Sequence, residues 1–547
     1  MFFRQKSSGG HHYLQIVENR WDNGRSRQRV LATLGRLDHL TQSGQLSALL
    51  ESGARFADSL TILSQHRRGE LPAVRSRRIG APLVFERLWQ ETGCAEVITV
   101  ALAQRQFGFA VERAIFLEVL HRLMAPGSDR AGYAWKQAYG LPGTEQLNLH
   151  HAYRAMAWLG EATGEKGTGK SGVRTTKDHL EEELFARRRD LFSSLELVFF
   201  DTTSLYFEGA GGQSLGQYGH SKDHRPGLRQ MIVGVVLDQE GWPICSELWP
   251  GNTTDVGTLL PIVERLRQRF GIERVCIVAD RGMIQKATVQ ALEERGWPYI
   301  LGARLRSSRE VRQQVLSHPG RFAQVTPRRQ TAKDPSPLAV KEVWVNGRRY
   351  IICRNEEQAR KDAADRQAIL AALQDRLPQG PKSLVGNRGF RRYLKVTGES
   401  FQIDPQRVQA EARYDGKWVL RTNTDYEPAD VAMSYKQLWM VEDLFRSMKS
   451  LLSTRPIYHR LDETIRGHVF CSYLALLLRT ELQDRLAAQG HGDVEWADVV
   501  RDLDRVEEVE LEKDGRCLLL RTEAVGVAGR VFQAAGVALP PTIRQAL

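Results

Sequence analysis

The stretch between residues 195 and 304 alternates strand-like and helix-like segments, and this alternation restricts the possible folds more than any other feature. Three consecutive strand-like runs come first, in residues 195–209, 229–241 and 242–251. Two further strands follow, each preceded by a helical segment, and the first of these helices has a start signal at Thr254-Asp255. Sequential strands followed by strand–helix–strand units predict a mixed α/β sheet covered by helices.

The sequence before this stretch predicts two smaller elements. Residues 13–37 read as a β-hairpin around an Asn23-Gly24 turn, because alternating apolar residues flank a dipeptide typical of tight turns. Residues 81–160 have the apolar spacing of helices, and a charged helix follows at 177–192.

Beyond residue 304 the alternation weakens. Short strand-like pieces at 339–354, 392–398 and 417–424 flank a polar helix near 355–376, which predicts a β-rich insertion. Residues 467–486 are apolar on nearly all sides, as in a buried helix. We therefore expect these parts: a basic hairpin region (1–80), a helical region with a linker (81–192), the first part of the sheet core (193–304), a basic β-rich insertion (305–425), the last part of the core (426–490) and a C-terminal region (491–547).

Positive charge is concentrated in two blocks. The chain has 77 Lys and Arg against 65 Asp and Glu, a net charge of +12. Residues 1–80 hold 13 basic and 6 acidic side chains, and residues 304–420 hold 24 and 12. Two basic blocks favour two surfaces for a polyanion such as nucleic acid. An arginine-rich composition also produces basic loops without a partner, and charge alone does not decide between these interpretations.

Composition excludes several other classes of protein. Hydrophobic residues at 42% and charged residues at 26% are ordinary for a globular protein rather than a disordered or collagen-like one. No apolar run approaches the ~20 residues of a membrane span, and no apolar segment near residue 1 resembles a secretory signal. The six cysteines are widely spaced without a CxxC pair, which predicts a reducing, cytoplasmic location.

Two aspartates stand where apolar strand-like runs end. Asp201 follows Leu197–Phe200, and Asp280 follows Val275–Ala279. Two such strands side by side would hold two carboxylates, the ligands that Mg²⁺ prefers. Aspartate is also common at strand ends as a turn residue or helix cap, and this second interpretation stays open.

A third acidic candidate, Glu442, lies in the segment 434–452, which separates cleanly on a helical wheel. One face has aromatic and basic residues around the glutamate: Tyr435, Leu438, Trp439, Glu442, Arg446 and Lys449. The opposite face is apolar: Val441, Leu444, Phe445 and Met448. Such a face fits contacts to phosphates and bases. The alternative is a solvated helix with an ordinary salt-bridged glutamate.

Other polar residues complete the set of candidates. Lys222, Arg225 and Arg229 form a basic cluster with His224 between two strands, either close to a phosphate or in a solvated loop. We expect Asp255 to cap the helix that follows it rather than to bind a metal. The histidines His459 and His468, and the pairs His11-His12 and His150-His151, are expected to be structural, since further ligands are not evident.

Residues Gly164–Ser171 fit the P-loop pattern GxxxxGK[ST] literally. A P-loop requires a buried strand before it and a helix directly after it, whereas a helical segment precedes this one and a polar stretch follows. A linker is therefore favoured. The alternative class, an ATP-dependent DNA-binding protein, would lose nucleotide binding in Lys170→Ala.

Taken together, these motifs resemble the DDE transposases of bacterial insertion sequences, which have a ribonuclease-H-like core. The resemblance rests on the segments LVFFDTTSLYFEG and VCIVADRGM and on the sequence between them that ends in GNTTD255. It also rests on the signature Tyr-x2-Arg-x3-Glu-x6-Lys, which Tyr435, Glu442 and Lys449 match, while Leu438 replaces the arginine. It extends over residues 195–475, includes the basic β-rich block as an insertion domain, and continues more weakly into the N-terminal hairpin.

The resemblance implies a fold, a reaction and partners. Asp201, Asp280 and Glu442 would hold two Mg²⁺ ions, with Mn²⁺ as a substitute, for DNA strand cleavage and strand transfer. Phosphate or base contacts would come from Tyr435, Trp439, Arg446, Lys449, Lys222, Arg225 and Arg229. The partners would be double-stranded DNA, both terminal inverted repeats and target, and a second copy of the chain, with no membrane. If a base is flipped, Trp439, Trp344 or Trp418 would receive it.

Two other functions stay open at this point. One is a catalytically inactive or domesticated DNA-binding protein with a degenerate core. The other is a ribonuclease-H-like nuclease that cleaves without strand transfer. Occupancy of all three acidic positions argues against degeneration.

Overall fold

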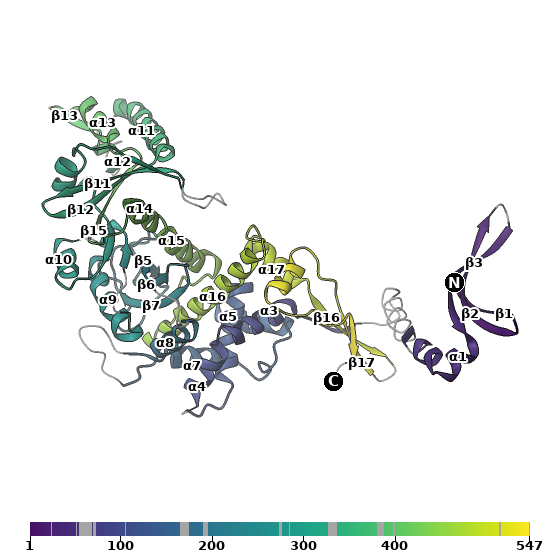
Figure 1. Ribbon diagram of the computed structural model, residues 1–547. Helices are drawn as coiled ribbons and strands as arrows, with labels where there is room; N and C mark the ends of the chain where they lie inside the picture. The colour runs from purple at the N-terminus through teal and green to yellow at the C-terminus, as the bar shows by residue number, and fades with distance from the viewer. Residues whose placement is uncertain are drawn as a thin grey trace. The chain divides into compact units, whose positions relative to one another are not determined.

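The computed structural model describes residues 1–22, 25–50, 52–53, 68, 73–103, 105–164, 174–189, 195–272, 276–283, 285–326, 336–379, 388–397, 400–513 and 516–545. The Asn23-Gly24 turn and residues 165–171 of the P-loop-like segment lie outside these ranges. The chain forms two compact units. The smaller contains Met1–Arg78, Arg505–Ala524 and Leu539–Leu547, and the larger contains Ile79–Asp504 and Val525–Ala538 (Figure 1).

The smaller unit contains two antiparallel sheets. The first has the order β1-β2-β3 and is followed by a short helix: β1 (Phe2–Ser8), β2 (His11–Asp22), β3 (Arg25–Arg36) and α1 (Leu37–Gln42). The expected hairpin is confirmed as β2 and β3, and β1 adds a third strand. Gly9 and Gly10, which join β1 to β2, have positive φ angles of 58° and 78° that favour glycine.

The second sheet joins distant parts of the sequence in the order β18-β17-β16-β4: β4 (Ala73–Arg78), β16 (Glu507–Lys513), β17 (Arg516–Arg521) and β18 (Ile543–Gln545). β4 pairs antiparallel with β16, and the Ser76 hydroxyl donates to the Glu507 carboxylate at 2.7 Å although 431 positions separate them. The C-terminal strands therefore belong to the same unit as the N-terminal hairpin.

The helical part of the larger unit packs around a long central helix, α16. Its members are α3 (Gly80–Glu91), α4 (Cys94–Leu102), α5 (Val111–Met124), α6 (Asp129–Trp135), η1 (Lys136–Ala138), α7 (Leu149–Gly160), α8 (Thr176–Arg188), α16 (Asp462–Ala488), α17 (Trp496–Asp504) and α18 (Ala528–Ala534). α16 is buried along most of its length, as its composition predicts. It crosses α7 closely, since a Cβ atom at Gly467 would lie 1.9 Å from the Met156 carbonyl oxygen.

A nine-stranded sheet has the order β10-β11-β12-β15-β9-β8-β5-β6-β7. Its central strands are β5 (Leu197–Tyr206), β6 (Gln230–Asp238), β7 (Pro243–Pro250), β8 (Cys276–Ala279) and β9 (Tyr299–Gly302). β5, β6 and β7 are antiparallel, whereas β5, β8 and β9 are parallel. The predicted mixed α/β sheet is thereby confirmed.

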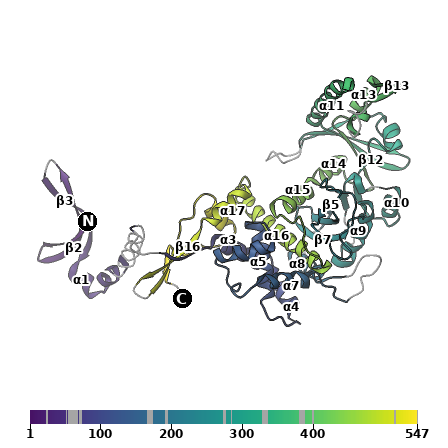
Figure 2. The same cartoon turned by 180° about the vertical axis from the view of Figure 1, so that it is seen from behind.

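Helices cover both faces of this sheet (Figure 1, Figure 2). α9 (Val256–Phe270) and α10 (Lys286–Glu294) pack on one face, where apolar residues of β5, β8 and β9 form a single cluster with them. The apolar sides of α14 (Pro428–Lys436) and α15 (Trp439–Arg446) pack on the other, followed by the turns of η6 (Ser447–Leu451). The η2 turn (Arg281–Met283) follows β8.

The insertion continues the core sheet. β10 (Ala323–Val325), β11 (Leu338–Val345), β12 (Arg348–Arg354) and β15 (Lys417–Thr422) extend the sheet beyond β9, with Leu420 opposite Gly302. η3 (Val311–Val315) shares an apolar cluster with β11 and β12. The remainder has a separate apolar cluster and contains α11 (Glu356–Arg376), η4 (Leu377–Gln379), α12 (Arg388–Arg391), β13 (Leu394–Thr397), β14 (Ser400–Ile403) and α13 (Pro405–Ala412). The predicted strands and polar helix are present; β10, β11, β12 and β15 join the core sheet, whereas β13 and β14 form a separate two-stranded sheet.

The prediction of a single helix over residues 434–452 is wrong. α14 ends at Lys436 and α15 begins at Trp439, with a turn at Gln437 and Leu438 between them. There the Leu438 amide donates to Tyr435, three residues back, instead of four. Leu438 is buried, so packing rather than a glycine or proline accounts for the break.

None of the helices in the described ranges is both long and apolar enough to cross a membrane.

Candidate active site

Asp201 and Asp280 lie next to each other at one end of the parallel β5–β8 pair. Phe200 and Ala279 are the last paired residues of this ladder, and each aspartate is the residue that follows. Phe200 belongs to the apolar cluster under α9 and α10, so alternation along β5 directs Asp201 to the face covered by α14 and α15.

The expectation that Asp201 ends its strand is wrong. β5 continues to Tyr206, and Asp201 lies opposite Val235 of β6. The strand lies within the predicted run 195–209, and it continues past Asp201 because β6 offers a hydrogen-bonding partner after β8 has ended. Asp280, by contrast, directly follows its strand as expected.

The electrostatic environment of Asp201 is crowded with carboxylates. Burial raises the pKa of Asp201 to about 6, the Lys222 ammonium opposes this rise, and Asp280 and Asp255 add to it. Its carboxylate accepts a hydrogen bond from the Thr202 amide at 2.7 Å. Carboxylate oxygens are the hard ligands that Mg²⁺ and Mn²⁺ prefer, so the chemistry of Asp201 and its acidic neighbours suits a divalent cation.

Glu442 lies in the first turn of α15 and is exposed. Within the described part of the chain it has neither a hydrogen-bond nor an ion-pair partner, unlike its neighbour Asp443, which pairs with Arg446 at 3.0 Å. The alternative of a salt-bridged glutamate is therefore not observed. The three candidate carboxylates do not gather within the 4.8 Å reach of one ion, as Asp129, His459 and His468 do.

Tyr435 is tied to Asp280 rather than exposed on a helix face. Its hydroxyl donates to the Asp280 carboxylate at 2.8 Å. Burial raises the pKa of Tyr435, and Asp280 adds to the rise, so the phenol stays a donor at neutral pH. Gly302 makes room for it, since a Cβ atom there would lie 2.3 Å from the hydroxyl oxygen. The tyrosine therefore orients a carboxylate at the site.

We expect Tyr435→Phe to reduce DNA cleavage by about 10- to 100-fold, as losses of groups that orient metal ligands do. The reason is that Asp280 loses the hydrogen bond that fixes its orientation. Single-turnover cleavage at saturating DNA measures the effect. Tyr139→Phe is a matched control. It also removes a hydrogen bond from a tyrosine hydroxyl to an aspartate, at 2.6 Å to Asp504, but neither residue is a candidate for the site. Equal losses in both variants would contradict the role of Tyr435.

The basic candidates differ in whether their charged groups already have partners within the protein. Lys449 donates to Asp223 at 2.7 Å, and Arg455 pairs with the same carboxylate. Arg225 is exposed beside the Tyr206 ring, with 5.7 Å between the guanidinium carbon and the ring centre.

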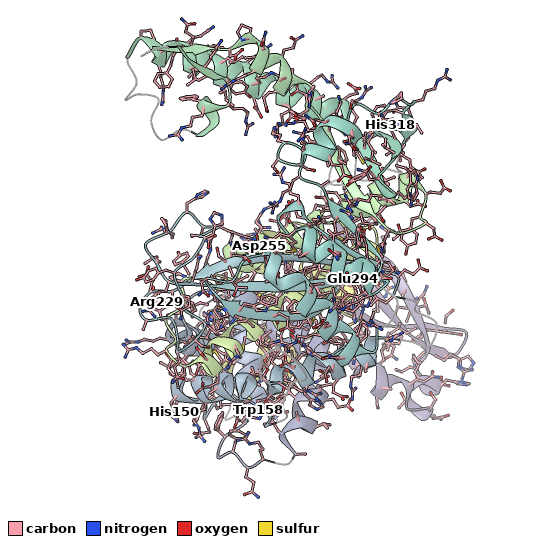
Figure 3. All side chains as sticks on the ribbon, turned by 90° about the vertical axis from the view of Figure 1, so that its left-hand side faces the viewer. His150, Trp158, Arg229, Asp255, Glu294 and His318 are labelled. Carbon is pink, nitrogen blue, oxygen red and sulfur yellow. The ribbon has the colours of Figure 1, made fainter. Side chains whose placement is uncertain are left out.

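Arg229 and Arg446 differ in the same way. Arg229 lies over the Tyr218 ring and donates to the Ala210 carbonyl oxygen at 3.1 Å (Figure 3). Arg446 is exposed, with 70% of its side chain accessible. Arg225 and Arg446 are thus the most accessible of the predicted DNA contacts.

The tryptophans proposed as base acceptors also differ. Trp344 and Trp439 are exposed, at 58% and 38%. Trp418 has the Lys436 ammonium 4.5 Å from its ring centre. Stacking on a base requires a free aromatic face, which favours Trp344 and Trp439.

Asp255 does not cap α9, contrary to the prediction. Asp255 occupies the N-cap position of α9 (Figure 3). Its backbone is already helical, and its side chain makes no capping bond. The Thr202 hydroxyl donates to one carboxylate oxygen at 2.7 Å, and Lys222 pairs with the other at 3.2 Å. These partners draw the carboxylate toward β5. The sequence feature that could have indicated a position near β5 is the location of the GNTTD segment between β7 and α9.

His459 and His468 belong to a buried polar cluster with Asp129 and Arg122. This is the one group in the described residues with three potential metal-binding atoms within 4.8 Å of one another. The Arg122 guanidinium is 3.1 Å from His468 Nδ1, and His468 Nε2 is 3.0 Å from the Thr454 carbonyl oxygen. Because the arginine already engages the nitrogen that would bind an ion, hydrogen bonding accounts for the cluster.

The sheet order and the acidic residues beside its central strands define a ribonuclease-H-like α/β enzyme core. Residues 193–478, more than half of the chain, match the family described as "Transposase DDE domain". The chain belongs to this family and is a DNA transposase of an insertion sequence. Residues 3–65 match a second family, "IS1634 family transposase, N-terminal domain".

Two further comparisons add little. Among solved structures, a piggyBac transposase synaptic complex with hairpin DNA has 10% sequence identity and a TM-score of 0.36, covering 78% of this chain and 77% of its own. A TM-score of this size does not establish a shared fold. Among curated proteins, none matches the chain.

Proposed function

We propose that this transposase binds the terminal inverted repeats of its insertion sequence and catalyses divalent-metal-dependent strand cleavage and strand transfer through Asp201, Asp280 and Glu442. The observation that carries the proposal is the placement of Asp201 and Asp280, each directly after the last pair of the β5–β8 ladder. The unpartnered carboxylate of Glu442 on α15 supports it.

Each acidic residue has a distinct place in the proposal. Asp201, as the central ligand, would hold both ions, Asp280 one and Glu442 the other. Two Mg²⁺ ions, or Mn²⁺ in their place, supply activation of the attacking oxygen and stabilisation of the leaving oxygen. The paired backbones of β5 and β8 fix the two aspartates, and the Tyr435 hydroxyl orients Asp280.

DNA binding is assigned to the basic and aromatic residues around these carboxylates. Arg225 and Trp439 are exposed and available to phosphates and bases, and Arg446 is exposed while it pairs with Asp443 at 3.0 Å. Lys222, Arg229, Tyr435 and Lys449 hold intramolecular partners and would contact DNA only after exchanging or sharing them. The basic regions 1–80 and 304–420 would extend the contact, and affinity would fall with salt because each neutralised phosphate releases counterions.

The remaining assignments concern assembly and location. Residues 1–80 and 81–192 are proposed to take part in recognising the element ends, and a homodimer would pair two ends. The chain would act on the bacterial nucleoid in the cytoplasm, consistent with six unpaired cysteines.

The test is a cleavage and joining assay on DNA that flanks this gene, with Mg²⁺ and separately with Mn²⁺. Cleavage at both element ends followed by joining to target DNA is the expected result. Binding without cleavage in either metal would indicate an inactive or regulatory DNA-binding protein. Cleavage without joining would indicate a nuclease.

A further inference from the structure

Lys222 is held in place by oxygen atoms of the protein. Its ammonium donates to the Thr202 carbonyl oxygen at 2.7 Å and to the Thr202 hydroxyl at 3.0 Å, and it pairs with Asp255 at 3.2 Å. An ammonium has three N–H donors, so these three acceptors use them all. Its backbone amide also donates to Ser204 at 2.9 Å. The lysine is therefore a fixed charge, which would have to exchange these partners before it followed a phosphate.

Asp255 completes this arrangement from the start of α9. Its two carboxylate oxygens have different partners, the Thr202 hydroxyl and the Lys222 ammonium. It also lies near the turn after Asp280, since a Cβ atom at Gly282 would be 3.6 Å from a carboxylate oxygen of Asp255. Thr202 is the residue after Asp201, so the network lies one residue along β5 from the proposed metal ligand.

We propose that Asp255 is a positioning residue, which with Thr202 fixes the Lys222 ammonium beside Asp201 and thereby sets the affinity of the site for divalent cations. This inference rests on the proposed function of Asp201 as a metal ligand. Lys222 repels an incoming cation, and Asp255 both attracts that cation and neutralises Lys222. Because the charges of Lys222 and Asp255 cancel, the pair leaves the net charge of the site unchanged. It nevertheless keeps the Lys222 ammonium next to the carboxylates.

The charge argument predicts opposite effects of two substitutions. Asp255→Asn removes a negative charge and leaves Lys222 uncompensated, so Mn²⁺ affinity falls about tenfold. Lys222→Met removes the repelling charge and raises Mn²⁺ affinity about tenfold. The double variant restores the net charge and returns to within about twofold of wild type, because the two charge changes cancel.

The experiment is a titration of the full-length protein with Mn²⁺ alone, without DNA, followed by electron paramagnetic resonance. Glu264→Gln is the matched control, since it removes an exposed charge on the same helix, where Glu264 is 3.6 Å from Arg295. Its affinity should stay at the wild-type value. Should Lys222→Met fail to fold, Lys222→Arg keeps the charge and should keep the wild-type affinity, while Asp255→Asn still tests the decrease.

The outcomes separate this inference from the proposed function. One outcome would overturn the inference alone. In it, Asp201→Asn loses Mn²⁺ binding, but Asp255→Asn and Lys222→Met change the Mn²⁺ affinity in the same direction or not at all. Binding that Asp201→Asn leaves intact would remove Asp201 from the metal site and overturn both. Opposite shifts with restoration in the double variant would establish the positioning role.

Discussion

Replacing Asp201 by Asn reduces DNA cleavage by more than about a hundredfold, while DNA affinity stays within about twofold of wild type. Losses of groups that merely orient metal ligands cost about 10- to 100-fold, so loss of a ligand itself costs more. We expect the same from Asp280→Asn and Glu442→Gln. DNA binding persists because phosphate contacts come from basic side chains around the carboxylates.

Single-turnover cleavage in Mg²⁺ and in Mn²⁺, with binding measured on the same DNA, checks this result. Asp443→Asn is the matched control, since Asp443 lies next to Glu442 on α15 but pairs with Arg446. Its cleavage should remain within about threefold of wild type, because an exposed ion pair contributes little. Full cleavage in any one of the three triad variants would remove that residue from the metal site.

The second large effect concerns stability. Arg269, at the end of α9, is buried among four acidic residues and joins α8 to the sheet. Its guanidinium contacts Glu182 at 2.7 Å, Glu181 at 2.8 Å and Glu247 at 3.0 Å. In Arg269→Met, these carboxylates still pair with Lys177, Arg265 and Arg174. One buried negative charge nevertheless loses its counterion, so the free energy of unfolding falls by about 3–5 kcal/mol.

The pH dependence of stability follows from the same network. Although burial opposes it, Lys177 and Arg269 hold the pKa of Asp178 below its ordinary value. A carboxylate with a lowered pKa stabilises the fold above the pKa of the unfolded chain, and this contribution is lost as pH falls. In Arg269→Met, the loss of folding stability that accompanies protonation of Asp178 becomes smaller.

Urea unfolding at pH 7 and at pH 4 measures both effects. Arg295→Met is the control, because Arg295 forms an exposed pair with Glu264 at 3.6 Å. Its loss should be below about 1 kcal/mol. A comparable loss in the two variants would show that the buried network adds no more than a surface pair.

The sequence predicts those parts of the site that depend on neighbouring residues. An apolar run followed by an aspartate identified both Asp201 and Asp280, because a buried strand and its end are local patterns. The position of Asp201 inside β5 rather than at its end depends on pairing with β6, about thirty positions further along the chain. The break at Gln437 and Leu438 lacks a glycine or proline signal and comes from the burial of Leu438.

Other features depend on contacts that local patterns do not encode. Asp255 has the sequence of a helix cap, and only the fold shows that Thr202 and Lys222 engage its carboxylate. In the same way, Lys449 reads as an exposed basic residue until Asp223 is found beside it. Long-range partners decide whether a polar residue is available to DNA.

The pairing of β4 with β16 makes one sheet depend on when the chain is finished. β4 emerges from the ribosome well before β16, since Glu507, which faces Arg78, follows it by 429 positions. Any polypeptide that terminates before β16 leaves β4 with an unpaired edge, the kind of backbone that associates with other strands. Fragments from interrupted translation would therefore lack this sheet, and only molecules translated through the C-terminal strands acquire it.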